Sequence, residues 1–291
     1  MSKISVVVPA FNEEDFIGGC LDRLVAQTRP IDEIIVVDNG STDATPRIVD
    51  RYVDAHPAVT RLVEREPGVM AARRAGFDAA TSDIIAKTDA DSRVALDWAE
   101  RIVDFFDSEV GVDHVAITGP VLTWDGPFYD FQKKLQTKTL GPLADGGEIR
   151  SLHGPNYALR KSVWHAVKGR LQTSEDVWED LDLGLALAES EYRMYFDPNV
   201  AADASCRQLR HSPVANRSYI TGGIRTARGR NNKDALKTMR IDLPVRVSMF
   251  TGMWVLFRPW DPSKKNWRPH RLLMPLERER RLVTSRRPHR E

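Results

Sequence analysis

The chain is expected to fold as an α/β protein built on a mostly parallel sheet with helices on both faces. Short runs rich in valine and isoleucine alternate with segments whose apolar residues recur at helical spacing. Polar residues follow each of the strongest apolar runs. The 291 residues, 42% hydrophobic and 29% charged, have the composition of an ordinary globular protein, which excludes collagen-like and disordered classes.

The first half of the chain has the clearer alternation. A β-branched run ends at Pro9 and fits a buried strand, and Asn12 is expected to cap the helix that follows. In order, the expected elements are strand 4–9, helix 16–25, strand 34–37, helix 47–55, strand 61–64, helix 69–80, strand 84–87 and helix 98–106. Strands joined by helices in this order favour parallel pairing, which gathers ligand-binding residues at the carboxyl ends of the strands.

The second half is less regular. In order, we expect strand 115–123, helix 128–140, a loop over 145–152, strand 156–159 and helix 177–190. The stretch 245–257 is largely apolar but is interrupted by Arg246, and the Pro- and Arg-rich end that follows is expected to be poorly ordered. We divide the chain into residues 1–110, 111–239 and 240–291.

Several classes of protein are excluded at this stage. No stretch reaches the roughly 18 consecutive apolar residues of a membrane span. The N-terminus reaches Glu13 and Glu14 before any signal-peptide pattern forms, and the two cysteines make neither a disulfide framework nor a zinc motif. We therefore expect a protein of the cytoplasm.

The charge of the chain is unevenly distributed. Residues 1–239 carry 29 basic and 36 acidic residues, whereas residues 240–291 carry 13 and 5. The segment 207–240 is already rich in arginine and lysine. A basic region of this kind suits phosphate groups on a nucleotide, a lipid or a nucleic acid.

Carboxylates mark the expected site. Asp89 and Asp91 follow the strand 84–87, and two carboxylates two residues apart can bind one divalent cation that neutralises a diphosphate. Short Asp-x-Asp strings also occur in ordinary turns, so this reading is open on its own. Asp38, after the strand 34–37, has the same two readings: contact with a base or ribose, or capping of the next helix.

Together these segments resemble the nucleotide-sugar half of family 2 glycosyltransferases of the GT-A fold. The matching strings are VVVPAFNEE at 6–14, DEIIVVDNGSTDAT at 32–45, GVMAARRAGFDAA at 68–80 and IIAKTDADSRV at 84–94. Downstream, GPNYALRKSVWHAVKG at 154–169 resembles the acceptor-side segment, and WEDLDLGLAL at 178–187 resembles the family's E-D-x-D-L helix. The resemblance covers roughly residues 4–230.

The resemblance implies roles for individual residues. Asp38 would contact the uracil or guanine ring, Arg73 would lie near base and phosphate, and Asp91 would coordinate Mn²⁺ or Mg²⁺ across the diphosphate. Asp180 would be the catalytic base. The resemblance also implies that Pro9, Ala10, Phe11 and Glu13 line the base and ribose pocket and that Asp89 lies beside the ribose. Ala90, Arg207 and Arg210 complete the donor-binding residues that we expect.

Inverting sugar transfer needs a carboxylate that takes the acceptor's proton and a positive charge that neutralises the departing diphosphate. Asp180 can take the acceptor's proton. Asp91 with its metal can neutralise the diphosphate, with help from Arg207 and Arg210. Two acidic pairs are present, 175–176 and 179–180, so Glu179 and Asp176 remain alternative bases. All four acids could also be a solvated helix start.

Two histidines are weaker candidates. His211 could complete the metal shell, since imidazole with carboxylate suits Mn²⁺ better than Mg²⁺, or it could be a surface histidine beside a proline. His153 could face the acceptor.

The expected partners are a nucleoside-diphosphate sugar and a glycan, lipid-linked or small-molecule acceptor. The aromatic and basic residues of 245–260 fit an interfacial helix on the inner face of a membrane, or equally a helix packed on the body or in a dimer.

The Q-x-x-R-W motif of processive synthases is missing. A nucleotidyltransferase is the alternative enzyme, but the loop 9–14 lacks a basic residue. A nucleic-acid-binding protein would have to act through its basic tail alone.

Overall fold

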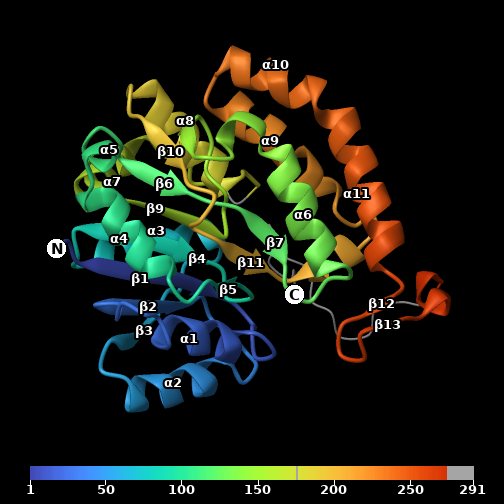
Figure 1. Cartoon of the computed structure of the whole chain (residues 1–291), viewed down its shortest axis with the longest axis horizontal. Helices are drawn as coiled ribbons and strands as arrows, with labels where there is room; N and C mark the ends of the chain where they lie inside the picture. The colour runs from blue at the N-terminus through green and yellow to red at the C-terminus, as the bar shows by residue number, and fades with distance from the viewer. Residues whose placement is uncertain (175, 274–291) are drawn as a thin grey trace, which may run out of the picture.

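A computed structural model describes residues 1–174 and 176–273. Its main sheet has eight strands in the order β3-β2-β1-β4-β9-β6-β10-β8. These strands are, in chain order, β1 (Ile4–Ala10), β2 (Glu33–Asp38), β3 (Val59–Val63), β4 (Ile84–Thr88), β6 (Ala116–Thr118), β8 (Gly147–Ile149), β9 (Asn156–Arg160) and β10 (Met194–Phe196). Figure 1 shows β2, β1, β9 and β6 one above another in the left part of the molecule.

The pairing of the strands is mixed, with the parallel part first. Strand β1 pairs in parallel with β2 and β4, and β2 pairs in parallel with β3. Strand β9 runs antiparallel between β4 and β6, while β10 is parallel to β6 and antiparallel to β8. The expected α/β fold with a mostly parallel sheet is therefore confirmed.

Two smaller sheets complete the strands. One has the order β5-β11-β7, formed by β5 (Arg93–Val94), β7 (Val121–Thr123) and β11 (Ala202–Ala204). The other is a C-terminal hairpin of β12 (Trp260–Asp261) and β13 (Asn266–Trp267).

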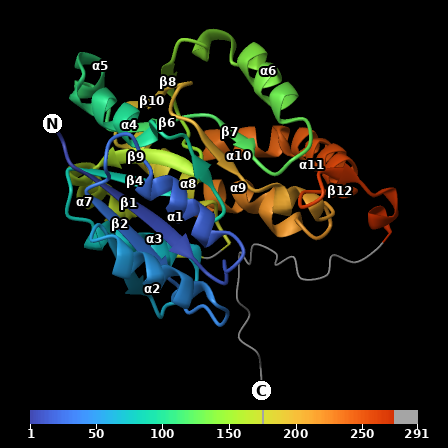
Figure 2. The same cartoon turned by 60° about the horizontal axis from the view of Figure 1, so that its bottom comes forward.

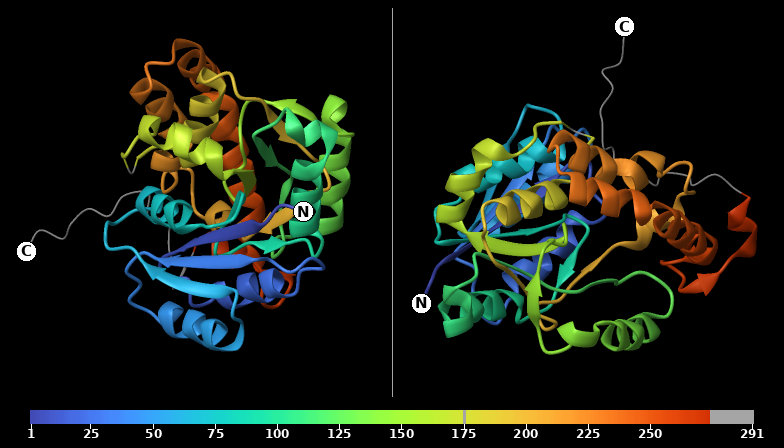
Figure 3. Two further views of the ribbon diagram at one scale, coloured as in Figure 1. Left: turned by 90° about the vertical axis from the view of Figure 1, so that its left-hand side faces the viewer. Right: turned by 90° about the horizontal axis from the view of Figure 1, so that it is seen from above.

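Helices cover both faces of the main sheet (Figures 1 and 3). On one face, α1 (Ile17–Val25), α2 (Thr45–Ala55) and α4 (Trp98–Asp107) bury their apolar residues against Val6 and Val8. On the other, α3 (Val69–Ala79), α7 (Lys161–Val167) and α8 (Glu179–Glu189) pack with Val7. Because side chains alternate along a strand, β1 contributes to both cores.

The other helices lie outside these two layers. They are α5 (Glu109–Val112), α6 (Tyr129–Thr139), α9 (Arg217–Gly229), α10 (Lys233–Ile241) and α11 (Leu243–Phe257), with short 3₁₀ turns η1 (Gly141–Leu143), η2 (Lys168–Arg170), η3 (Cys206–Arg210) and η4 (Pro269–Leu272). Figure 1 shows α9, α10 and α11 together at the side away from β3. In the described part of the chain, no helix is both long and apolar enough to span a bilayer.

Three expectations about local structure were wrong. Asn12 does not cap α1: its φ is 57°, its side-chain oxygen accepts from the Thr42 amide, and the helix begins five residues later. The strand expected over 115–123 is split into β6 and β7 at Gly119-Pro120, where proline supplies no N–H for a ladder. The loop expected over 145–152 contains β8.

The chain after Phe257 was expected to be poorly ordered. Up to residue 273 it instead forms the β12–β13 hairpin and η4, with Asp261 accepting ion pairs from Arg268 and Arg271. The rest of that expectation concerns residues 274–291, which lie outside the described residues.

Candidate active site

The carboxyl ends of β2, β1 and β4 meet at one edge of the main sheet. Ala10 pairs with Asp38 at the ends of β1 and β2, and the segment 89–91 leaves the neighbouring strand β4. Asp38 is buried, accepts from the Ser41 amide at 2.9 Å, and lies 3.7 Å from an Arg61 nitrogen. The parallel topology thus brings together three of the expected donor-binding segments.

Asp91 belongs to a buried ionic cluster around Arg207. Arg207 donates from both terminal nitrogens to the Glu13 carboxylate at 2.7 Å, while its Nε lies 2.8 Å from Asp91 Oδ2. Its guanidinium also stacks over Phe16. The Trp124 indole donates to the Asp91 carbonyl at 2.9 Å. This cluster ties η3 to the ends of β1 and β4.

Burial raises the pKa of Asp91 to about 7, with nearby Asp89, Glu13 and Asp125 adding to the increase and Arg207 opposing it. Burial likewise raises the pKa of Glu13. Several acids therefore crowd around the Arg207 guanidinium. Additional positive charge at this place would relieve their mutual repulsion.

Lys87 forms a second buried network at the end of β4. Its ammonium contacts Asp89 Oδ1 at 2.5 Å, the Gly154 carbonyl at 2.8 Å and Glu179 Oε1 at 2.9 Å. Arg73, which is 1% exposed, donates to both the carboxylate and the carbonyl oxygen of Glu179. Burial opposes the charge of Glu179, but Lys87 and Arg73 together lower the pKa of its carboxyl.

Asp180 lies beside this network at the start of α8. Its Oδ2 accepts from the Gly154 amide at 2.9 Å, and its Oδ1 accepts from the Leu181 amide at 2.8 Å. Burial, followed by the charge of Glu179, raises the pKa of Asp180. Lys87 contacts both Asp89 and the Gly154 carbonyl, and the Gly154 amide donates to Asp180, so Lys87 and Gly154 link the Asp89 and Asp180 carboxylates.

The other expected residues have different surroundings. Ala10 and Ala90 are each 3% exposed and belong to the apolar core, so a ligand could meet only their backbone. Pro9 and Phe11 are half-buried at the end of β1. Arg73 is buried and donates to the Glu179 carboxylate.

The basic and histidine candidates also differ. Arg210 is buried, and His211 follows it at the end of η3, four residues beyond Arg207. The His153 ring contacts the Gly119 carbonyl at 2.8 Å. Asp176 is exposed, and its neighbour Glu175 lies outside the described residues.

The oxygen donors at the end of β4 fit a hard divalent cation. Within the described ranges, no group of three His, Cys, Asp or Glu side chains is already arranged to hold a metal. Asp91 and Asp89 could nevertheless provide one or two carboxylates, which is how Mg²⁺ is commonly held when phosphate oxygens and water complete the shell. The raised pKa of Asp91 agrees with such a site, because a cation would favour its ionised form.

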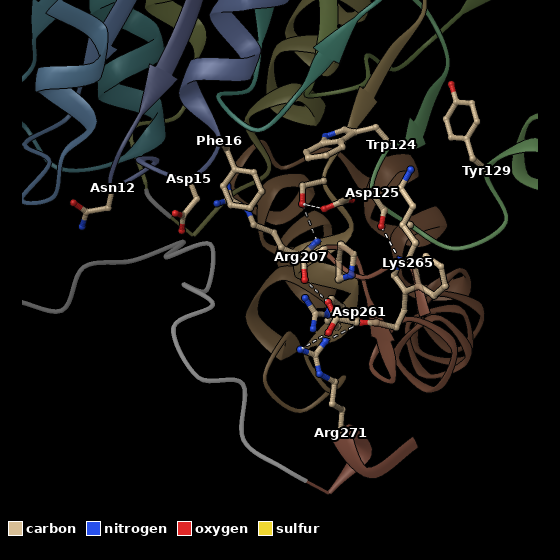
Figure 4. Close-up of a pocket in the computed structure, with 16 residues that line it drawn as sticks. Asn12, Asp15, Phe16, Trp124, Asp125, Tyr129, Arg207, Asp261, Lys265 and Arg271 are labelled. Atoms are coloured by element: carbon tan, nitrogen blue, oxygen red, sulfur yellow. Dashed lines mark hydrogen bonds and ion pairs between the residues drawn. The ribbon is translucent and has the colours of Figure 1, made fainter. Parts of the chain in front are cut away.

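A cavity of about 730 Å³ adjoins the Arg207 cluster (Figure 4). Aromatic residues from the body and the C-terminal hairpin line it: Phe16, Trp124, Tyr129 and Trp260. Of the expected donor-binding residues, Arg207 and Arg210 line this cavity. It therefore lies next to the ionic cluster and shares Arg207 with it.

Comparison with known proteins decides the family. The chain matches the model of Glycosyl transferase family 2 over residues 5–167. The chain belongs to this family. The match includes the three segments of the donor edge and most of the acceptor-side segment, up to residue 167, and it leaves the nucleotidyltransferase and nucleic-acid alternatives without support.

Curated relatives of this family 2 glycosyltransferase match it over shorter stretches. Glycosyltransferase AglE of Haloferax volcanii is 37% identical over 115 residues, 38% of each chain. Dodecaprenyl-phosphate galacturonate synthase of Rhizobium johnstonii is 40% identical over 94 residues, 31% of this chain and 28% of that protein. The matched segments thus span well under half the length of these relatives.

Solved structures confirm the GT-A fold. Mannosyltransferase PcManGT from Pyrobaculum calidifontis, in complex with GDP-Man and Mn²⁺, has a TM-score of 0.64 at 23% identity, covering 87% of this chain and 74% of that one. S. aureus TarS 1–349 in complex with UDP-GlcNAc has a TM-score of 0.56 at 18% identity, covering 86% and 73%.

Sequence reasoning missed two residues that shape the glycosyltransferase site. Lys87 joins Asp89 to Glu179, and Gly154 joins Lys87 to Asp180 through its carbonyl and amide. The signal for Lys87 was present, because a lysine in the apolar strand IIAKT must be buried and therefore needs carboxylate partners. Nothing local in the sequence identifies the Gly154 contact.

Proposed function

We propose that the chain is an inverting glycosyltransferase that moves a single sugar from a UDP- or GDP-linked donor to an acceptor hydroxyl. The observation that carries this proposal is the contrast between Asp180 and Glu179. Glu179 is neutralised by two buried cations, whereas backbone N–H groups orient Asp180 and its pKa is raised. A carboxylate with a raised pKa is the better proton acceptor.

In the proposed reaction, the acceptor oxygen attacks the anomeric carbon from the face opposite the diphosphate. The new carbon–oxygen bond forms as the bond to the leaving phosphate oxygen breaks, and the acceptor's proton passes to Asp180. The fixed position of Asp180 at the start of α8 lets it receive that proton without reorganisation. Glu179 is left to hold Lys87 and Arg73 in place.

Donor binding is assigned to the other end of the site. Asp38 would accept from a base N–H, and Asp89 would contact the ribose. Asp91, with His211, would hold a divalent cation, which supplies charge neutralisation for the departing diphosphate when it is bound. Arg207 would keep Asp91 and Glu13 in position, and Arg210 would add positive charge near the phosphates.

The names of relatives support parts of this proposal. PcManGT is described with GDP-Man and Mn²⁺ and TarS with UDP-GlcNAc, which favours a metal-assisted nucleotide-sugar reaction in this chain. Two curated relatives act, by name, on dodecaprenyl phosphate and on glucosyl-dolichyl phosphate. We therefore propose a lipid-linked or other cell-envelope glycan acceptor.

The proposed acceptor implies work at a membrane surface. We assign residues 1–110 to the donor, 111–239 to the acceptor and catalytic base, and 240–291 to contact with the cytoplasmic face of a membrane. Helix α11 supports the last assignment, because its sequence is apolar around most of its circumference while only Phe250 and Phe257 are buried.

Nucleotide binding tests the donor half of the proposal. Thermal unfolding should be measured with UDP, GDP and dTDP, each with and without Mn²⁺. A ligand at 100 times its Kd stabilises the folded state by about 2.7 kcal/mol, so binding should give a clear rise in Tm.

Asp91→Ala should remove the Mn²⁺-dependent part of this rise, because it removes the central carboxylate. Asp104→Asn, at an exposed position on α4, is the control and should behave like the wild type. An unchanged Mn²⁺-dependent shift in Asp91→Ala would show that the metal site lies elsewhere.

A further inference from the structure

Helix α6 presents its apolar side to solvent. No residue of this helix is buried, and Phe131 and Leu135 are 63% and 48% exposed. Phe128, at the N-cap, is 58% exposed. The spacing of these residues, three and then four positions apart, places them on one face.

Polar residues attach α6 to the body. Gln132 accepts from the Thr123 hydroxyl at 2.8 Å and donates to the Pro127 carbonyl at 2.8 Å. The Tyr129 hydroxyl donates to Asp203 at 2.6 Å. A helix on a globular protein normally buries its apolar face, whereas α6 leaves its large apolar side chains exposed.

Lysines accompany the exposed apolar face. Lys133, Lys134 and Lys138 are all exposed, and Asp130 is the helix's single acidic residue. At 100° per residue, Lys134 and Lys138 flank Phe131 and Leu135 on one side. The helix therefore presents large apolar side chains bordered by positive charge.

We infer that α6 docks on an anionic lipid bilayer, with its axis along the surface and its phenylalanine and leucine side chains among the lipids. This inference goes beyond the proposed reaction and adds a second contact to the one assigned to residues 240–291. Helices with an apolar face bordered by lysine bind at such interfaces through apolar burial and attraction to anionic headgroups. Figure 2 shows α6 at the rim of the molecule, away from the main sheet.

The charge and size of the patch favour a bilayer over a second copy of the chain. Two copies meeting through α6 would bring their lysines together, whereas anionic headgroups would attract them. A stable protein interface buries at least about 1,000 Å², which a few side chains on one short helix do not supply. Phe128 also packs on Trp267 with ring centroids 5.8 Å apart, so the base of α6 adjoins the C-terminal hairpin.

Vesicle co-sedimentation tests the inference on the full chain. Wild-type protein should bind vesicles containing phosphatidylglycerol more strongly than pure phosphatidylcholine vesicles. The double variant Phe131→Ser, Leu135→Ser should lower the partition coefficient for the anionic vesicles about tenfold. The control variant Val110→Ser, Val112→Ser also removes two exposed apolar side chains, on α5, and should bind like the wild type.

Hydrogen exchange provides a second measurement. Amides of residues 129–139 should exchange more slowly when anionic vesicles are added to the wild-type chain. Equal binding by the wild type and the α6 variant, or unchanged exchange in α6, would overturn the inference. So would a dimer in solution that the α6 substitutions dissociate, which would identify a second copy as the partner. Nucleotide-dependent thermal shifts of the α6 variant would remain, so failure here is distinct from failure of the proposed reaction.

Discussion

Asp180 and Glu179 are adjacent in sequence but differ in environment, and that difference leads to a prediction at the scale of single residues. Asp180→Asn should lower the transfer rate by about 10²–10⁴-fold, because the amide cannot accept the proton from the acceptor. Nucleotide binding should persist, because the contacts assigned to the donor lie on β1, β2, the segment 89–91 and the η3 region, and none of them is changed by this substitution. The measurement is sugar transfer beside nucleotide-dependent thermal shift.

The first acidic pair supplies the control for this prediction. Asp176 is exposed and precedes α8, so Asp176→Asn should retain wild-type transfer. Transfer that survives in Asp180→Asn but is lost in Asp176→Asn would move the base to the first pair.

The positions of single site residues could be predicted where they belong to the family's sequence motifs. The partners of buried residues could not be predicted in this way. The order of segments placed Asp38, Asp89 and Asp91 near one sheet edge, as parallel topology requires. It gave no sign that Arg207 would pair with Asp91 and Glu13. Arg207 lies 194 positions after Glu13, and it is also distant in sequence from Asp91. The string that suggested a donor-binding role for Arg73 gave no sign that its buried guanidinium pairs with Glu179.

Arg73 joins two helices, α3 and α8, on the same face of the sheet. Helix α3 carries Arg73 and helix α8 carries Glu179, and both side chains are buried. Arg73 and Lys87 both form ion pairs with the buried Glu179 carboxylate. Arg73→Met removes the first of these pairs and should destabilise the fold by about 3–5 kcal/mol. The measurement is the free energy of unfolding from urea titration.

The neighbouring arginine is a matched control. Arg74 is half-buried on the same helix, and Arg74→Met should change the free energy of unfolding by about 0.5 kcal/mol or less. If the two variants are equally stable, the Arg73–Glu179 pair does not join α3 to α8 in the way inferred here.

Elements with strong periodicity were predicted well, and elements that depend on distant partners were not. The apolar runs of β1, β2 and β4 are central strands buried on both faces, so their sequences are almost continuously apolar. Strand β8 has the short sequence GEI and pairs with β10 at the sheet edge, which no local pattern indicates. Asn12 has the residue type of a cap, yet its amide and side chain bind the loop after β2.

For the molecule as a whole, the C-terminal region packs against α9 and the start of α8. Helix α11 contacts α9 through Arg246, which stacks over Trp178 and donates to the Ile220 carbonyl at 3.0 Å. Trp178 immediately precedes Glu179 at the start of α8. The inner side of α11 therefore supports the helix that carries the proposed base.

The membrane proposal can be tested by substitutions on the outer side of α11, which leave the contacts of Arg246 with Trp178 and Ile220 in place. Deleting residues 245–291 should reduce vesicle binding, but it would also remove Arg246 from Trp178 and expose apolar surface of the body. Substituting Val245, Met249 and Leu256 by serine is cleaner, because these side chains are 70%, 47% and 41% exposed. The triple variant should keep the wild-type Tm to within a few degrees and lose most binding to anionic vesicles.

Salt dependence separates the electrostatic from the apolar part of this binding. Raising NaCl from 0.1 to 1 M shortens the Debye length from about 10 to 3 Å, so wild-type binding to anionic vesicles should weaken while the apolar contribution remains. Val214→Ser removes a side chain that is 71% exposed before α9, and it should leave both binding and its salt dependence unchanged. If the α11 variant binds as tightly as the wild type at both salt concentrations, the outer face of this helix does not contact lipid. A salt-sensitive attraction would then have to come from basic residues outside α11.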